Sequence, residues 1–66
     1  MRKSYSSREI IKILEADGWR LQKIVGSHHN FKHPTKKGKT TVHHPTKDIH
    51  PKTLSSIEKQ SGLIFK

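Results

Sequence analysis

The chain has 66 residues, which is enough for one domain, and we assign residues 1–66 to a single unit. Its 14 lysines and arginines outnumber 5 acidic residues, so the formal net charge is +9 and nucleic acid is the expected partner, ahead of an acidic protein or an anionic membrane. The absence of cysteine excludes disulfides and cysteine-based zinc sites. Because the chain has neither a membrane-length apolar run nor a hydrophobic segment after Arg2 and Lys3, we expect a cytosolic protein.

A first helix is predicted to begin after Ser6, because Ser6 and Glu9 have the spacing of a capping box, in which each side chain bonds the backbone N–H of the other. Apolar side chains then recur at the i, i+3, i+4 spacing of one helix face, at Ile10, Ile13 and Leu14. Gly18 is the expected end of this helix, since glycine readily adopts the left-handed conformation that follows many helix C-termini.

Three short strands are predicted next, at residues 19–25, 28–33 and 39–43. The turns between them are expected at Gly26-Ser27 and at residues 34–38. Because both connections are short, consecutive strands should pair as antiparallel hairpins.

The alternation of side chains predicts which residues share a face of the sheet. Phe31 is the only strongly apolar residue of the second strand, so its face should pack against the helices, which leaves the other face to His28, Asn30 and Lys32. In the first strand, one predicted face holds Trp19, Leu21, Lys23 and Val25. The alternate positions are Arg20, Gln22 and Ile24. Trp19 is expected in the core rather than on a base-stacking surface.

A second helix is predicted from about Ile49 to Gly62, with Pro51 in its first turn and with Leu54 and Ile57 facing the core. The element order is therefore helix, three strands, helix. We expect an α+β fold of αβββα order, in which both helices cover one face of a three-stranded antiparallel sheet.

The tetrapeptide His-Pro-Thr-Lys occurs twice, at residues 33–36 and at residues 44–47. Each copy follows a predicted strand, so we interpret both as strand exits. On this interpretation, two imidazoles and two lysines should lie near the same edge of the sheet.

Histidine is the strongest candidate for catalysis or metal binding in this chain, which has 6 histidines. A metal site is disfavoured, because the histidines follow no metal-binding spacing and the few carboxylates are not paired. No metal or cofactor is therefore expected. General acid–base catalysis on RNA needs none, because an imidazole that titrates near neutrality can remove the proton of a ribose 2′-hydroxyl. The alternative, on spacing alone, is that His28 and His29 only decorate a polar turn.

Four segments, quoted in chain order, cover most of the sequence. They are Asp17-Gly18-Trp19, Gly26-Ser27-His28-His29-Asn30-Phe31-Lys32-His33-Pro34, Thr41-Val42 with His44-Pro45-Thr46-Lys47-Asp48-Ile49, and Ile57-Glu58-Lys59-Gln60-Ser61-Gly62-Leu63. Together, with their spacings, they resemble the HicA toxins of bacterial HicAB toxin–antitoxin systems, the YcfA-like group. Each segment alone is a weak signal, and the combination is specific.

This resemblance implies a fold like that of the double-stranded-RNA-binding domain and a metal-independent endoribonuclease, an mRNA interferase that arrests translation and growth. It also implies a HicB-type antitoxin that binds the toxin and blocks its active site. The catalytic histidine of the family's Gly-Ser-His motif falls on His28, with Gly26, Ser27 and His29 beside it as supporting residues.

Two questions stay open at the level of the sequence. The second catalytic group is unnamed, and the candidates by nearness are Lys32, His43 and His44. Basic residues that could hold RNA phosphates are Lys23, Lys32, Lys36, Lys37 and Lys39. The alternative function is a non-catalytic basic RNA-binding module of similar shape, which would need no particular residue at position 28.

Overall fold

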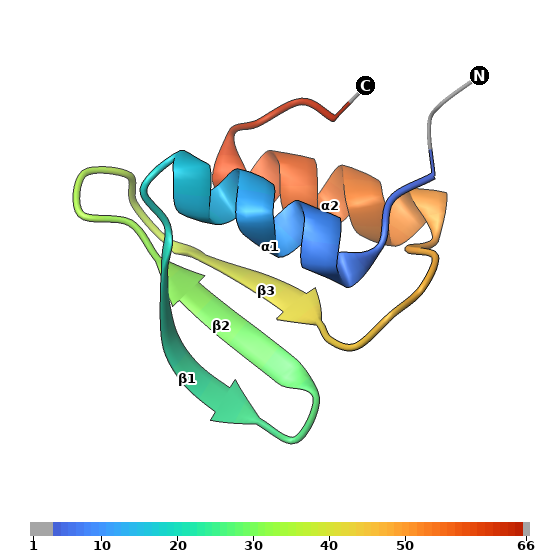
Figure 1. Cartoon of the computed structure of the whole chain (residues 1–66). Coiled ribbons are helices and arrows are strands. Elements are labelled where there is room, and N and C mark those ends of the chain that lie inside the picture. Colours follow the sequence, from blue (N-terminus) through green and yellow to red (C-terminus); the bar gives the residue numbers. More distant parts are fainter. Residues whose placement is uncertain (1–3, 66) are drawn as a thin grey trace.

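Two helices cover one face of a three-stranded antiparallel sheet in the computed structural model, which describes residues 4–65 (Figure 1). The elements are α1 (Ser7–Ala16), β1 (Arg20–Val25), β2 (His28–Lys32), β3 (Lys39–His43) and α2 (Pro51–Ser61). The predicted αβββα order is confirmed, with element ends that differ from the predicted ones by one or two residues. Residues 1–3, which include Arg2 and Lys3, lie outside the described part.

Local signals set the ends of both helices as predicted. At the start of α1, the backbone N–H of Glu9 donates to Ser6 Oγ at 3.2 Å and the backbone N–H of Ser6 donates to Glu9 Oε1 at 3.0 Å, which completes the capping box. Gly18 follows α1 with φ +104°, and Gly62 ends α2 in the left-handed conformation. The side chain of His50 caps α2 by accepting the backbone N–H of Lys52 at 3.2 Å.

The core lies between the helices and the inner face of the sheet. Within residues 4–65 its buried apolar side chains are Tyr5, Ile10, Leu14, Trp19, Phe31, Val42, Ile49, Leu54, Ile57 and Phe65. Trp19 and Phe31 are each 1% exposed, so the predictions that Trp19 is core and that Phe31 faces the helices are confirmed. Both helices contact β3, which is therefore the best-covered strand.

The strand order is β1-β2-β3, and its register differs from simple alternation at one point. Leu21 pairs with Phe31 and Lys23 pairs with Asn30, so Gln22 is an extra residue in a β-bulge. The predicted alternation along β1 is therefore wrong, because the bulge reverses the parity of the residues before it. As a result Arg20 lies on the same face of the sheet as Lys23 and not on the opposite one.

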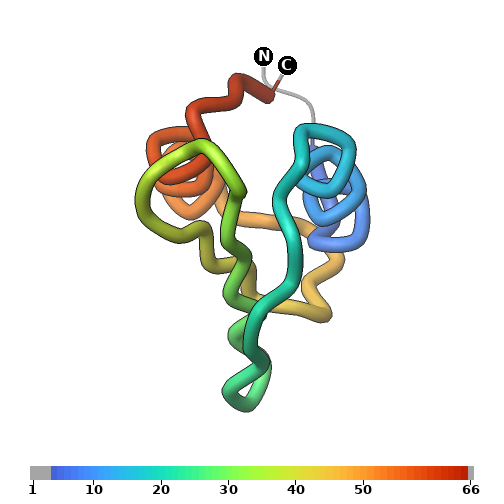
Figure 2. Tube along the Cα trace, turned by 90° about the vertical axis from the view of Figure 1, so that its left-hand side faces the viewer, coloured from blue at the N-terminus to red at the C-terminus, as the bar shows by residue number. Residues whose placement is uncertain are grey.

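The hairpin of β1 and β2 projects beyond the two helices, as the view from the side shows (Figure 2). Every residue of β1 is exposed, and its three apolar side chains, Leu21, Ile24 and Val25, are about half accessible to solvent. β1 is also an edge strand, with β2 on one side only. The tip of this hairpin is thus held by strand pairing more than by burial.

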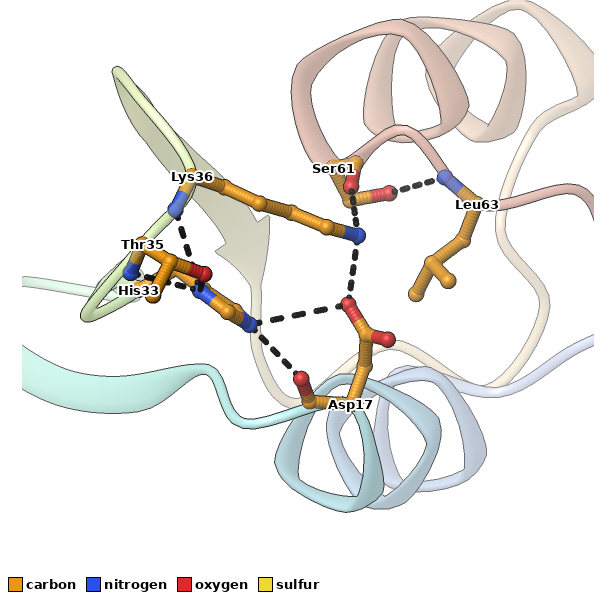
Figure 3. A network of polar contacts seen from close by, with 6 residues as sticks. All are labelled: Asp17, His33, Thr35, Lys36, Ser61 and Leu63. Atoms are coloured by element: carbon orange, nitrogen blue, oxygen red, sulfur yellow. Dashed lines mark hydrogen bonds and ion pairs between the residues drawn. The ribbon is translucent and has the colours of Figure 1, made fainter.

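At the end of the sheet opposite the β1–β2 turn, a polar network joins the β2–β3 turn to both helices (Figure 3). The ammonium group of Lys36 donates to Asp17 Oδ2 at 2.7 Å and to the carbonyl of Ser61 at 3.1 Å. His33 Nδ1 accepts the backbone N–H groups of Thr35 and Lys36, both at 3.1 Å, so its Nε2 carries the proton that is donated to the Asp17 carbonyl at 2.7 Å. The β2–β3 turn is thereby fastened to the ends of α1 and α2.

The two His-Pro-Thr-Lys copies lie at opposite ends of the sheet, so the prediction that they share an edge is wrong. His33 bonds the backbone of Asp17 after the C-terminus of α1, whereas His44 Nδ1 lies 2.6 Å from the hydroxyl of Ser7 at the first residue of α1. The reason is topological: β2 and β3 run antiparallel, so chain segments that leave their C-terminal ends depart in opposite directions.

Candidate active site

The β1–β2 turn consists of Gly26 and Ser27 between the paired residues Val25 and His28. Gly26 has φ +61°, and Ser27 is not among the residues with positive φ. A positive φ at the first central position only is the pattern of a type II′ turn, which suits the right-handed twist of a two-residue hairpin and favours glycine at that position. The glycine therefore allows the tight turn from which Ser27 and His28 extend.

His28 lies exposed on the open face of the sheet and has His43 of β3 as its direct cross-strand neighbour. The two imidazole rings have centroids 5.2 Å apart and are tilted by 34°. His43 Nε2 lies 2.7 Å from Ser27 Oγ, so the turn serine holds this second ring. His28 itself has no hydrogen-bond partner on either ring nitrogen among residues 4–65, which leaves both nitrogens available.

The neighbouring histidine, His29, points to the other face and belongs to a separate pair. Its ring meets that of His44 edge to face, with centroids 5.1 Å apart. The hydroxyl of Ser7, which is 1% exposed, lies 2.6 Å from His44 Nδ1 and accepts the backbone N–H of Thr46 at 2.8 Å. His29 and His44 therefore join the hairpin tip to the start of α1, and their rings are directed away from His28.

The open face of the sheet forms three rows of cross-strand neighbours, because the register pairs one residue from each strand. The first row is Val25, His28 and His43, the second is Lys23, Asn30 and Thr41, and the third is Arg20, Lys32 and Lys39. Successive rows are about 7 Å apart, twice the rise per residue of a strand. The histidines thus stand at one end of this face and the cations at the other.

A groove of about 330 Å³ runs over the cationic part of the open face. Its lining residues are Gln22, Lys23, Asn30, Lys32 and Lys39. None of the chain's five acidic residues, which stand at positions 9, 15, 17, 48 and 58, lies on a strand. Like charges directly opposite each other destabilise a sheet, so the third row is a local cost that an anionic ligand would offset.

The lysines predicted to bind RNA do not all come together. Lys32 and Lys39 are direct cross-strand neighbours in the groove, and Lys37 is exposed in the turn between their strands. Lys36 instead directs its ammonium group toward Asp17 and Ser61 at the helix ends. Arg20 was not predicted at this surface, because only the bulge at Gln22 brings it onto the open face.

The described residues include no cluster of three or more histidine and carboxylate side chains with the geometry of a metal site. What the open face offers chemically is a pair of imidazoles, with Lys23 one row away and Arg20, Lys32 and Lys39 two rows away. An imidazole can exchange a proton near neutral pH, and lysine and arginine can neutralise phosphate charge. Such a set of groups can act on a phosphodiester that carries its own nucleophile.

Comparison with known proteins identifies the family to which the chain is similar. A family model described as HicA toxin of bacterial toxin-antitoxin matches residues 7–63, which include all five helices and strands. No individual curated protein matches the chain. Within residues 4–65, no helix has both the length and the apolar character that crossing a membrane requires.

Proposed function

The chain belongs to the HicA toxin family of bacterial toxin–antitoxin systems, and from this we propose that it is a metal-independent endoribonuclease that cleaves mRNA, with His28 as its catalytic histidine. The observation that carries the proposal is the position of His28, an exposed imidazole on the open face with no hydrogen-bond partner among the described residues. A general base must reach its proton directly, and this ring is accessible to do so.

The proposed reaction uses the substrate's own nucleophile. His28 removes the proton of a ribose 2′-hydroxyl, the 2′-oxygen forms a bond to the adjacent phosphorus, and the bond from phosphorus to the 5′-oxygen breaks. The products are a 2′,3′-cyclic phosphate and a 5′-hydroxyl end, so neither a metal nor a water molecule is required in this step. DNA lacks the 2′-hydroxyl and should not be cleaved.

The cationic rows of the open face support binding of the RNA strand that His28 would cleave. Phosphates that follow or precede the scissile one can lie over Lys23, Lys32 and Lys39, whose groove starts one row away from His28. Such contacts hold the backbone without reading its sequence.

The family also implies an antitoxin, and we propose that it is of the HicB type and covers the open face when bound. Val25 is an exposed apolar residue of the open face, in the row next to Lys23, and the exposed Leu21 and Ile24 lie on the opposite face of the same edge strand. A partner that carries acidic and apolar side chains would therefore match this surface in both respects.

The proposal is tested by expressing the intact chain and His28→Ala in bacteria and by incubating both purified proteins with RNA and with DNA of the same sequence. We expect growth arrest, mRNA loss and 2′,3′-cyclic phosphate ends for the intact chain only. General base catalysis contributes roughly 10²–10⁴-fold, so the variant should lose cleavage by at least that factor. Its fold should persist, because His28 is exposed.

Two results would contradict the proposal. Cleavage by His28→Ala at the rate of the intact chain would remove His28 from the active site. RNA binding without cleavage by either protein, with toxicity from both, would establish the alternative of a non-catalytic RNA-binding module.

A further inference from the structure

We propose that His43 is the second catalytic imidazole of this protein, the general acid that protonates the leaving 5′-oxygen while His28 acts as the base. This inference rests on the proposed ribonuclease function and identifies the partner of His28 in it. It follows from the register of β2 and β3, which places His28 and His43 side by side although they are 15 positions apart in the chain.

The geometry of the pair fits one phosphate. Cross-strand neighbours share a face, so both rings stand on the open face, and both residues are exposed. Their centroids are 5.2 Å apart, and a hydrogen bond between heavy atoms spans ~2.6–3.2 Å. A phosphate seated over the pair can therefore present its attacking oxygen to one ring and its leaving oxygen to the other.

Ser27 can hold the His43 ring in both of its charge states. Its Oγ lies 2.7 Å from His43 Nε2. In the proposed step the ring loses the proton of its other nitrogen and keeps the one on Nε2, so Ser27 Oγ can accept from Nε2–H in the imidazolium and in the neutral ring alike. The other nitrogen, Nδ1, has no partner among residues 4–65 and remains free to give its proton to the substrate.

The two other candidates for the second group lie elsewhere. Lys32 is four residues along β2 from His28, about 13 Å at the rise of a strand, so it cannot reach the same phosphate oxygens. His44 is next to His43 but points to the other face, where it contacts His29 and Ser7. Of the three candidates, His43 is the one that stands beside His28.

The two histidines together account for every proton that moves in the step. Neutral His28 gains the proton of the 2′-hydroxyl, and protonated His43 loses its proton to the 5′-oxygen as the bond from phosphorus to that oxygen breaks. The reaction thus begins with one ring neutral and one ring charged, and it ends with the charges exchanged. Such a requirement gives a bell-shaped dependence of the rate on pH.

Other titratable and charged groups near the pair come from three places. Asp48 and His50 line a cavity of about 240 Å³ together with His43, and Lys23 of β1 is in the neighbouring row of the open face. His44 follows His43 directly and is bound to Ser7. A test must therefore separate His43 from these groups and from a change in the fold.

The decisive experiment compares two substrates that differ only in the leaving atom. One is a short RNA, and the other has sulfur in place of the bridging 5′-oxygen at the scissile phosphate. A thiolate is a much weaker base than an alkoxide and leaves without being protonated. The proteins are the intact chain, His43→Ala, His28→Ala, Ser27→Ala and, as the control, His50→Asn, which removes a nearby imidazole but keeps a side chain that caps α2 well.

We expect His43→Ala to cleave the normal RNA about 10²–10⁴-fold more slowly than the intact chain and the sulfur substrate at nearly the rate of the intact chain. His28→Ala should be slow on both substrates, because the base is still needed. Ser27→Ala should cleave the normal RNA more slowly than the intact chain but faster than His43→Ala, and it should cleave the sulfur substrate at nearly the rate of the intact chain. His50→Asn should cleave both substrates as the intact chain does. The limb of the pH profile at high pH, where the acid is deprotonated, should disappear in His43→Ala.

Equal losses of His43→Ala on both substrates, or no loss on either, would overturn the assignment of His43 as the acid. Rescue of His28→Ala instead of His43→Ala would also overturn it, since the roles would be reversed. These outcomes differ from a failure of the proposed function, in which the intact chain itself would cleave neither substrate.

Discussion

The two adjacent histidines at the hairpin tip have different surroundings because a strand alternates its side chains. His28 faces solvent beside His43, and His29 faces the helices beside His44. Each pair is anchored by a serine, Ser27 on the open face and Ser7 on the other. One pair is therefore accessible for chemistry, while the other fastens the tip to α1.

The substitution Gly26→Ala tests whether the conformation of the β1–β2 turn matters for stability and for cleavage. A Cβ at this position would meet no atom within 4 Å, so the cost of Gly26→Ala comes from its φ of +61° and not from crowding. We expect a loss of about 1–2 kcal/mol in the free energy of unfolding, measured with urea. We also expect a loss of RNA cleavage at a temperature where the protein is folded, because the turn that presents Ser27 and His28 changes.

Gly38→Ala is a matched control for this change. Gly38 also has a positive φ, +79°, and open space at its Cβ, but it lies in the other turn, away from His28. It should lose similar stability and keep its cleavage. Unchanged cleavage by Gly26→Ala would show that the conformation of the β1–β2 turn is not part of the site.

At the scale of elements, the end of the molecule opposite the histidines is held by charge as well as packing. The hydrogen bond from Lys36 keeps the pKa of Asp17 below its ordinary value of 3.8, with the charge of Lys36 acting in the same direction and partial burial opposing both. Lys36 also reaches the last residue of α2. This single side chain therefore couples the β2–β3 turn to both helices.

The pKa of Asp17 predicts a loss of stability in acid. Because the folded-state pKa is lowered, the contribution of the Asp17 carboxylate is present above pH ~4 and disappears as pH falls through the folded-state pKa. Asp17→Asn should therefore melt at a lower temperature than the intact chain at about pH 6 and at the same temperature near pH 2. Thermal unfolding across this range measures the difference.

Glu15→Gln is the control for this prediction. It removes an exposed carboxylate from the last turn of α1 that forms no ion pair among the described residues. A difference in melting temperature between Asp17→Asn and the intact chain that stays constant from acid to neutral pH would rule out the ion pair as its cause.

At the scale of the whole molecule, the charged residues of the three strands are basic only, apart from histidine. All acidic residues lie on helices or loops, whereas the strands carry arginine and lysine in the open face. This distribution gives the open face a positive surface that attracts a polyanion to the same face as His28 and His43.

Salt dependence tests this arrangement. Each phosphate contact with a single strand contributes about 0.7 to the slope of log K against log salt concentration. The double change of Lys32→Gln and Lys39→Gln, made in the His28→Ala protein to prevent cleavage, should make the slope shallower by about 1.4. RNA binding measured at several salt concentrations gives this slope.

A pair of helix lysines is the matched control for the same change of charge. Lys12 and Lys52 are exposed on α1 and α2, away from the strands, so Lys12→Gln with Lys52→Gln should leave the slope nearly unchanged. Equal slopes for the two double variants would show that RNA does not lie on the open face.

The sequence by itself determined the elements, their ends and the general character of the surface. The capping box of Ser6 and Glu9, the glycine after each helix and the alternation around Phe31 depend on residues a few positions apart, so they are legible without a structure. The excess of basic residues and the Gly-Ser-His motif likewise needed no coordinates.

Only the tertiary structure decided which distant side chains meet. The bulge at Gln22 moved Arg20 onto the open face, and Lys36 turned out to bind Asp17 rather than lie with Lys32. The pairing of His28 with His43 depends on the register between two strands, which is set by the packing of the whole sheet against the helices. Long-range pairs of this kind leave no local pattern in the chain, and so the contact between the rings of His28 and His43 became visible only in the fold.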